Sequence, residues 1–283
     1  MRILLINPNT SRAMTATIAA AAREVAGADA EIVAVCPEPG RGPAAVESHV
    51  DEVAAAAAVV ELVRADLASG GSDADVLACF GDPGLDAARE LVEVPVIGIA
   101  EAAMHVAAIA GRRFAIVTTL GRTLGRARDL VARYGMDRAC AQYRAVEIPV
   151  LALEEPDEHT LARIERECRA ALDPPALGAV GASGAAGDPV DAIVLGCAGM
   201  ADLCAQLSAR VDAPVIDGVA AAVGLAIGMA RMGVRTGGRG EYAPPPVRKH
   251  PRNDASIASD VSSDAAMTPH PQPRAREAML WQM

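Results

Sequence analysis

Short apolar stretches alternate with longer, alanine-rich stretches along most of this chain, as strands and helices do in α/β proteins. In the first half, strands are predicted over residues 2–6, 31–35, 76–78 and 96–99, and helices over residues 12–25, 46–67 and 83–91. The second half repeats this order, with strands over residues 113–117, 144–148, 193–195 and 215–216, and helices over residues 124–134, 159–172, 199–210 and 219–232. Buried strands that alternate with helices predict parallel sheets covered on both faces.

The repeated order predicts two pseudo-symmetric α/β lobes, each a mostly parallel sheet flanked by helices, with an active site in the cleft between them. We assign residues 1–98 plus 214–236 to the first lobe and residues 99–213 to the second. Residues 237–283 are rich in Pro, Ser, Asp and Arg and are predicted to form a disordered tail. A Gly/Ala/Pro-rich stretch over residues 173–188 predicts a loop.

Two cysteines occupy matching positions in the two halves. Cys79 follows Asp75 and an apolar strand, and Cys197 follows Asp191 and a second one. A Pro-Val-Ile segment begins 16 residues after the first cysteine and 17 after the second. Because ligands collect at the carboxyl ends of parallel strands, the two thiols are predicted to face each other across one pocket. This arrangement suits two-base proton transfer, in which one thiolate removes a proton from a carbon and the other thiol delivers one to the opposite face.

The positions of these cysteines also lead to an expectation about ionisation. A thiol at a strand end and before a helix faces backbone N–H groups and the positive end of the helix dipole, and both lower its pKa. Asp82 comes directly before Pro83 and is expected to be the N-cap of the helix that follows. The remaining cysteines are expected to pack in the core or to be incidental, namely Cys36, Cys140, Cys168 and Cys204.

An enolate formed at the substrate needs hydrogen-bond donors aimed at its oxygen. Backbone amides beside glycines can approach a ligand closely, and short polar side chains at strand ends can hold its polar edge. The predicted substrate-binding residues are Asn9, Phe80, Gly81, Thr118, Thr119, Ala198 and Gly199.

Composition excludes several other mechanisms. The only lysine, Lys249, follows three consecutive prolines, which is a poor setting for a Schiff-base enzyme such as a pyridoxal-phosphate racemase. The sequence has no C-x-x-C pair and no Cys/His spacing typical of zinc sites, so we expect neither a cofactor nor a metal. A net charge of −10 argues against nucleic-acid and anionic-membrane partners. We expect a cytoplasmic protein that binds a small molecule, and its alanine-rich helix faces leave room for a homo-oligomer.

Four segments carry a family resemblance, at residues 2–11, 79–84, 95–102 and 195–200. With them the chain resembles the hydantoin/allantoin racemase family of the aspartate/glutamate racemase superfamily over about residues 1–236. The resemblance implies a cofactor-independent two-base racemase, with Cys79 and Cys197 matching the catalytic pair of the family. It implies 5-monosubstituted hydantoins as substrates, or else allantoin.

Other functions stay open at this point. The same frame serves amino-acid racemases, isomerases and decarboxylases of the superfamily, although decarboxylases keep only one of the two cysteines. A non-catalytic ligand-binding protein with structural thiols would bind such molecules without turnover.

Overall fold

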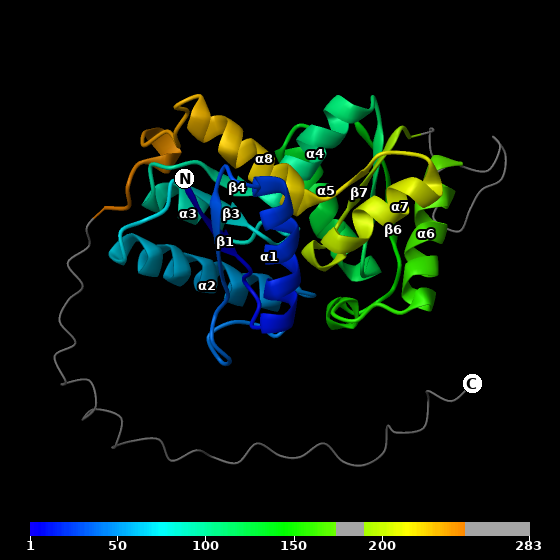
Figure 1. Cartoon of the computed structure of the whole chain (residues 1–283), viewed down its shortest axis with the longest axis horizontal. Helices are drawn as coiled ribbons and strands as arrows, with labels where there is room; N and C mark the ends of the chain where they lie inside the picture. The colour runs from blue at the N-terminus through cyan, green and yellow to red at the C-terminus, as the bar shows by residue number, and fades with distance from the viewer. Residues whose placement is uncertain (174–189, 247–283) are drawn as a thin grey trace, which may run out of the picture. The chain divides into compact units, whose positions relative to one another are not determined.

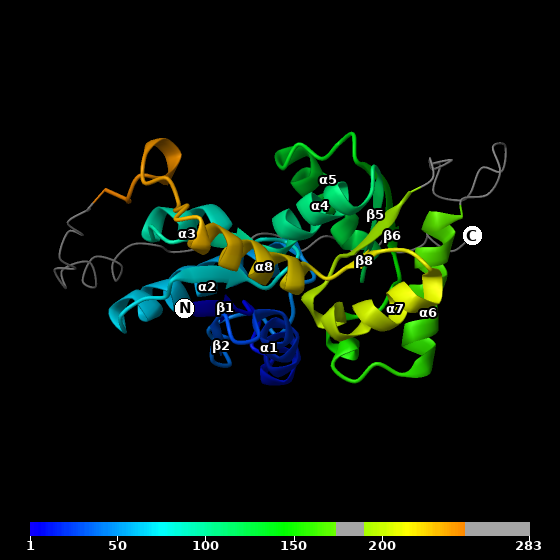
Figure 2. The same cartoon turned by 45° about the horizontal axis from the view of Figure 1, so that its top comes forward.

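The computed structural model describes residues 1–173 and 190–246, and in this part the chain forms two four-stranded parallel sheets. The strand order is β2-β1-β3-β4 in the first sheet and β6-β5-β7-β8 in the second (Figures 1 and 2). The first sheet contains β1 (Arg2–Ile6), β2 (Glu31–Val35), β3 (Ala74–Leu77) and β4 (Val96–Gly98). The second sheet contains β5 (Phe114–Thr118), β6 (Cys140–Ala145), β7 (Ala192–Leu195) and β8 (Val215–Ile216). The predicted fold class, two parallel-sheet lobes flanked by helices, is confirmed.

Helices cover both faces of each sheet. The α-helices are α1 (Arg12–Ala26), α2 (His49–Ala68), α3 (Leu85–Leu91), α4 (Ile99–Ala110), α5 (Leu124–Arg133), α6 (Glu158–Leu172), α7 (Cys204–Val211) and α8 (Gly218–Arg231). Short 3₁₀ helices are η1 (Gly121–Thr123), η2 (Val150–Leu153), η3 (Ala198–Leu203) and η4 (Gly240–Tyr242). In the first sheet, α1 and α8 pack on one face and α2 and α3 on the other. In the second, α6 and α7 pack on one face and α4 and α5 on the other.

Several predicted boundaries differ from the structure. Helix α4 was not predicted, because it begins directly after Gly98, the last residue of β4, with no loop between them. Strand β6 begins earlier than the predicted strand at 144–148, and the predicted helix at 199–210 divides into η3 and α7. Strand β8 pairs with β7 in the second sheet, although residues 214–236 were assigned to the first lobe. Helix α8, in the same stretch, does pack on the first sheet. The remaining lobe boundaries stay a prediction.

The predicted tail begins with an ordered segment, which corrects the expectation for residues 237–246. Within it, η4 packs against α3, and the Tyr242 hydroxyl donates to Asp86 Oδ1 over 3.1 Å. Disorder was predicted from the Pro, Ser, Asp and Arg content, but the Tyr242 ring over the Arg89 guanidinium supplies a contact that composition does not reveal. The rest of the tail, and the predicted loop at 173–188 apart from its first residue, lie outside the described residues.

Hydrogen bonds from backbone N–H groups show which two aspartates occupy equivalent positions in the two halves of the chain. The Asp73 carboxylate accepts from the backbone N–H of Arg2, and the Asp191 carboxylate accepts in the same way from Arg113. Each aspartate lies six residues before the cysteine of its half, Cys79 or Cys197. Asp73, and not Asp75, is therefore the counterpart of Asp191.

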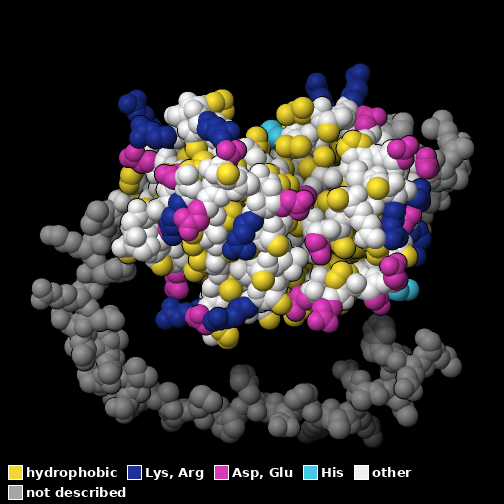
Figure 3. All heavy atoms as spheres, in the orientation of Figure 1, with side chains coloured by type: hydrophobic (Ala, Val, Ile, Leu, Met, Phe, Trp, Pro, Cys, Tyr) yellow, Lys and Arg dark blue, Asp and Glu magenta, His cyan; other side chains and the backbone are white. Residues whose placement is uncertain are grey.

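Asp75 lies inside β3 and is almost fully buried. Its Oδ1 has no hydrogen-bond partner, and burial, reinforced by the negative charge of Asp66, raises the pKa of its carboxyl to about 7. A folded pKa above the unfolded value means that the group stabilises the fold fully below about pH 3.9 and loses this contribution as the pH rises through the folded pKa. Figure 3 shows acidic and basic side chains interspersed over one face of the molecule, whereas the Asp75 carboxyl is buried inside β3.

We predict that Asp75→Asn stabilises the protein more at pH 8 than at pH 5. The change in the free energy of unfolding should be more favourable at pH 8 by on the order of 1–2 kcal/mol, because the buried carboxyl of the folded protein ionises only at the higher pH. Denaturant unfolding of both proteins at the two pH values measures this difference. Asp129→Asn, at an exposed position of α5, is the control and should change neither value. An equal effect of Asp75→Asn at both pH values would contradict the prediction.

Candidate active site

One pocket lies where the carboxyl ends of the two sheets meet, as expected for parallel α/β folds. Its empty space is about 630 Å³, part of which opens to solvent, and this is enough for a small heterocycle. Most predicted site residues line it, namely Asn9, Cys79, Phe80, Gly81, Thr118, Thr119, Cys197 and Ala198. Gly199 does not belong to the lining among the described residues. It lies behind the pocket, where a Cβ would be 3.3 Å from Met14 Cε.

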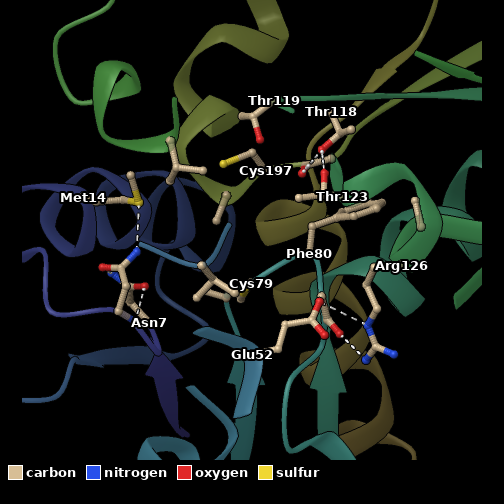
Figure 4. Close-up of a pocket in the computed structure, with 18 residues that line it drawn as sticks. Asn7, Met14, Glu52, Cys79, Phe80, Thr118, Thr119, Thr123, Arg126 and Cys197 are labelled. Carbon is tan, nitrogen blue, oxygen red and sulfur yellow. Dashed lines mark hydrogen bonds and ion pairs between the residues drawn. The ribbon is translucent and has the colours of Figure 1, made fainter. Parts of the chain in front are cut away.

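The two thiols reach this pocket from different sheets. Cys79 follows β3, and Cys197 follows β7 after Gly196, so both come directly after the central strands of their sheets. A Cβ at Gly196 would be 2.8 Å from Thr118 Cβ, so glycine is required for Thr118 to approach and donate to the Gly196 carbonyl over 3.0 Å. Figure 4 shows both cysteines at the pocket, with the Thr119 hydroxyl beside Cys197. The structure thus brings the predicted pair together.

The expectation of lowered thiol pKa values is wrong. Burial raises the pKa of Cys79 to about 12 and that of Cys197 to about 11, from an ordinary value of 9.0. The predicted amide effect is present, because backbone N–H groups of Gly81 and Gly199 each lower the pKa of the neighbouring thiol, but it is smaller than the cost of desolvation. The negative charges of Cys197, Asp82 and Glu52 also raise the pKa of Cys79.

Asp82 does not cap the helix that it precedes. The N-cap of α3 is Gly84, which has a left-handed backbone and no side chain to offer. The Asp82 carboxylate instead accepts hydrogen bonds from the backbone N–H groups of Ala100 and Glu101, at the start of α4. Asp82 is therefore a capping residue, as predicted, but it caps α4 and not α3. Helix α4 begins 17 residues further along the chain.

A network of asparagines forms the wall of the pocket after β1. Asn9 Oδ1 accepts from Asn7 Nδ2 and from the Ser11 backbone N–H, both over 2.9 Å. Asn9 Nδ2 donates to Met14 Sδ over 3.4 Å (Figure 4). Ser11 is the N-cap of α1, and its hydroxyl also donates to Glu154 of the second lobe over 2.5 Å. The wall is therefore fixed to both lobes.

Sequence reasoning missed the charged part of the pocket, which is formed by Glu52 of α2 and Arg126 of α5 (Figure 4). Arg126 Nε lies 3.5 Å from Glu52 Oε1, and its guanidinium donates to the Gly81 carbonyl over 2.8 Å. The Nε atom is buried and has no hydrogen-bond partner of its own. Both residues lie within helices at positions that look like ordinary solvated faces, so the sequence carried no signal for them.

Two absences concern the described residues alone. Within them, no group of three or more His, Cys, Asp or Glu side chains is arranged to hold a metal ion. No described helix has the length and apolar character needed to cross a membrane. The cytoplasmic location and the homo-oligomer stay predictions.

Comparison with known proteins identifies the family. Residues 3–226 match the family model for Asp/Glu/Hydantoin racemases. The chain is 40% identical over 248 residues to a hydantoin racemase of Rhizobium meliloti, an alignment that covers 88% of this chain and 96% of that protein. The fold is thus that of a racemase-type α/β protein. The chain belongs to the Asp/Glu/Hydantoin racemase family.

Solved structures of relatives have the same fold. An allantoin racemase from Klebsiella pneumoniae superposes with a TM-score of 0.79 at 47% identity, covering 88% of this chain and 95% of that one. An allantoin racemase from Pseudomonas fluorescens also gives a TM-score of 0.79, at 36% identity, covering 88% of this chain and 99% of that one. The family resemblance drawn from the four sequence segments is confirmed.

We predict that alkylation of Cys79 and Cys197 by iodoacetamide becomes about tenfold faster per pH unit between pH 7 and pH 10, because the thiolate is the nucleophile and both raised pKa values lie above this range. Mass spectrometry of the modified peptides measures each rate, and Cys197 should reach its plateau at the lower pH. A plateau below pH 8 for either thiol would contradict the raised pKa values.

Proposed function

We propose that this protein racemises 5-monosubstituted hydantoins at ring carbon C5 by two-base proton transfer between Cys79 and Cys197. The observation that carries the proposal is the placement of one thiol from each lobe on a single pocket. A hydantoin C5–H is acidic because it lies between an amide nitrogen and a carbonyl, and removal of this proton gives an enolate.

In one direction, the thiolate of one cysteine removes the C5 proton and becomes a thiol, while the C–H electron pair moves into the enolate. The thiol of the other cysteine then gives its proton to the opposite face of C5 and becomes the thiolate. The enzyme is left with the two protonation states exchanged, ready for the other enantiomer. No cofactor, oxidant or reductant is required by this balance.

The raised pKa values of the thiols have a direct bearing on this step. A thiolate whose conjugate acid has a pKa of about 11 to 12 is a stronger base than an ordinary cysteine thiolate, so the proton transfer from carbon is less uphill. The cost is that few molecules carry the thiolate at neutral pH. The hydroxyl of Thr119, which lies beside Cys197, is the side-chain donor that we assign to the enolate oxygen, because the Thr118 hydroxyl already donates to the Gly196 carbonyl.

We predict that one enantiomer of 5-isobutylhydantoin in D₂O loses optical rotation and exchanges its C5 proton in the presence of the protein. Cys79→Ser and Cys197→Ser should each lower racemisation at least about 100-fold, because serine is a far weaker acid–base group at these positions. In each variant, exchange without inversion should survive for only one enantiomer, and for opposite enantiomers in the two variants.

Polarimetry and proton NMR of the same sample measure racemisation and exchange. Cys36→Ser is a matched control, since Cys36 is also partly exposed and does not belong to the described pocket lining. Binding without any exchange would favour the ligand-binding alternative, and normal racemisation by both pocket variants would contradict the two-base assignment.

A second candidate substrate, allantoin, is favoured by the Glu52–Arg126 pair. Allantoin is a hydantoin with a ureido group at C5, which offers one carbonyl acceptor and several N–H donors. Arg126 presents a buried Nε without a hydrogen-bond partner, and the Glu52 carboxylate lies 3.5 Å from it. This pair is complementary to a ureido group, whereas an alkyl substituent gains nothing from it.

We predict that Arg126→Met lowers kcat/KM for allantoin at least about tenfold more than kcat/KM for 5-isobutylhydantoin, because loss of the contact with Gly81 affects both substrates, whereas loss of a hydrogen bond from a charged donor affects allantoin alone. Glu52→Gln, which keeps the shape of the side chain, should follow the same trend more weakly. Because the two substrates meet the same thiols, equal losses for both would mean that the pair supports the pocket and does not select the substituent.

A further inference from the structure

The turn that carries Cys79 is held by one buried carboxylate. Asp82 lies three residues after Cys79, and its backbone N–H donates to the Cys79 carbonyl over 2.9 Å. Its φ is 44°, a left-handed value that aspartate adopts only when other contacts compensate. Those contacts are made by the side chain, which is 4% exposed and accepts hydrogen bonds from Ala100 N over 3.2 Å and Glu101 N over 3.0 Å.

The start of α4 has space for the Asp82 carboxylate because its N-cap residue is a glycine. The N-cap of α4 is Gly98, and a Cβ at this position would lie 2.4 Å from Asp82 Cγ. The equivalent helix of the second repeat, α8, has its own aspartate at the N-cap, where Asp217 accepts from Val219 N and Ala220 N. In the first repeat, the carboxylate that caps α4 therefore comes from the turn after Cys79. Gly98 leaves space for it.

The second lobe holds the same carboxylate. The hydroxyl of Tyr134, at the end of α5, donates to Asp82 Oδ2 over 2.7 Å. From the other end of α5, Arg126 donates to the carbonyl of Gly81, the residue before Asp82. One helix of the second lobe thus contacts two consecutive residues of the turn that follows Cys79. The residue three positions after Cys197 is Met200, so the second turn has no carboxylate in this place.

We propose that Asp82 and Tyr134 form a latch between the lobes that positions Cys79, and only Cys79, against the pocket. Both are positioning residues, because neither lines the pocket among the described residues. The latch also joins the turn to the start of α4, which packs on the second sheet. The part of this proposal that concerns proton transfer rests on the proposed racemase function, and the part that concerns the position of Cys79 does not.

Loss of the latch should displace Cys79, and this displacement should affect the two directions of racemisation differently. When Cys197 removes the proton, Cys79 must protonate the opposite face of the enolate. A displaced Cys79 fails at this step, so the proton, or a deuteron from solvent, returns from Cys197 with retention. In the reverse direction Cys79 is the base, and a displaced base lowers the rate of proton removal without favouring exchange over inversion.

The decisive variant is Tyr134→Phe, which removes one hydroxyl and keeps the ring. We predict that the ratio of exchange with retention to inversion in D₂O rises at least threefold for the enantiomer that Cys197 deprotonates and stays within about 1.5-fold for the other. The enantiomer is identified beforehand with Cys79→Ser, which retains exchange only from the one that Cys197 deprotonates. Tyr143→Phe is the matched control, since this tyrosine belongs to the same lobe and its hydroxyl contacts Cys140 instead. Equal changes for both enantiomers, or no change, would overturn the latch.

A second measurement needs no substrate. In Tyr134→Phe, iodoacetamide should alkylate Cys79 at least threefold faster than in the unsubstituted protein, while the rate for Cys197 stays the same. Asp82→Asn, which can still cap α4, should give a smaller change than Asp82→Ala, and Asp217→Asn should give none at Cys79. Equal alkylation rates in all variants would overturn the latch. If the protein fails to exchange any hydantoin but Cys79 still responds selectively, the racemase proposal fails and the latch stands.

Discussion

The structure depends on a single constraint: the carboxyl ends of the strands of two sheets meet at one small pocket. Each sheet supplies its thiol from the second residue after a central strand, so neither lobe can form the site alone. Burial at this junction is also the dominant electrostatic effect, because it outweighs the backbone N–H groups that point at both sulfurs. The position of the thiols and their basicity therefore have the same origin.

The lobes are joined by an exchange of helices as well as by side chains. Helix α4 leaves the edge strand of the first sheet and packs on the second, while α8 leaves the edge strand of the second sheet and packs on the first. The two helices also pack against each other. A motion that separated the lobes would have to break this crossed packing, so the distance across the pocket is set by the cores and not by the loops that line it.

Much of this could be predicted from the sequence, because apolar strands, turn residues and the repeated cysteine frame are local patterns. The pairing of Cys79 with Cys197 in one pocket was found in this way. Three features could not be found, because they are tertiary. The partner of the Asp82 carboxylate lies on another helix, Glu52 and Arg126 meet across the lobes, and the pKa of a thiol depends on how much water the fold removes. Asp75 was matched to Asp191 by residue type, and only the backbone hydrogen bonds show that Asp73 holds the equivalent place.

The raised thiol pKa values also bear on chemical durability. Disulfide formation and oxidation to sulfenic acid begin with attack by a thiolate, so two thiols that stay protonated at neutral pH react slowly with each other and with peroxide. Both cysteines are free in the structure. Desolvation thus favours the reduced form of two sulfurs that share one small pocket.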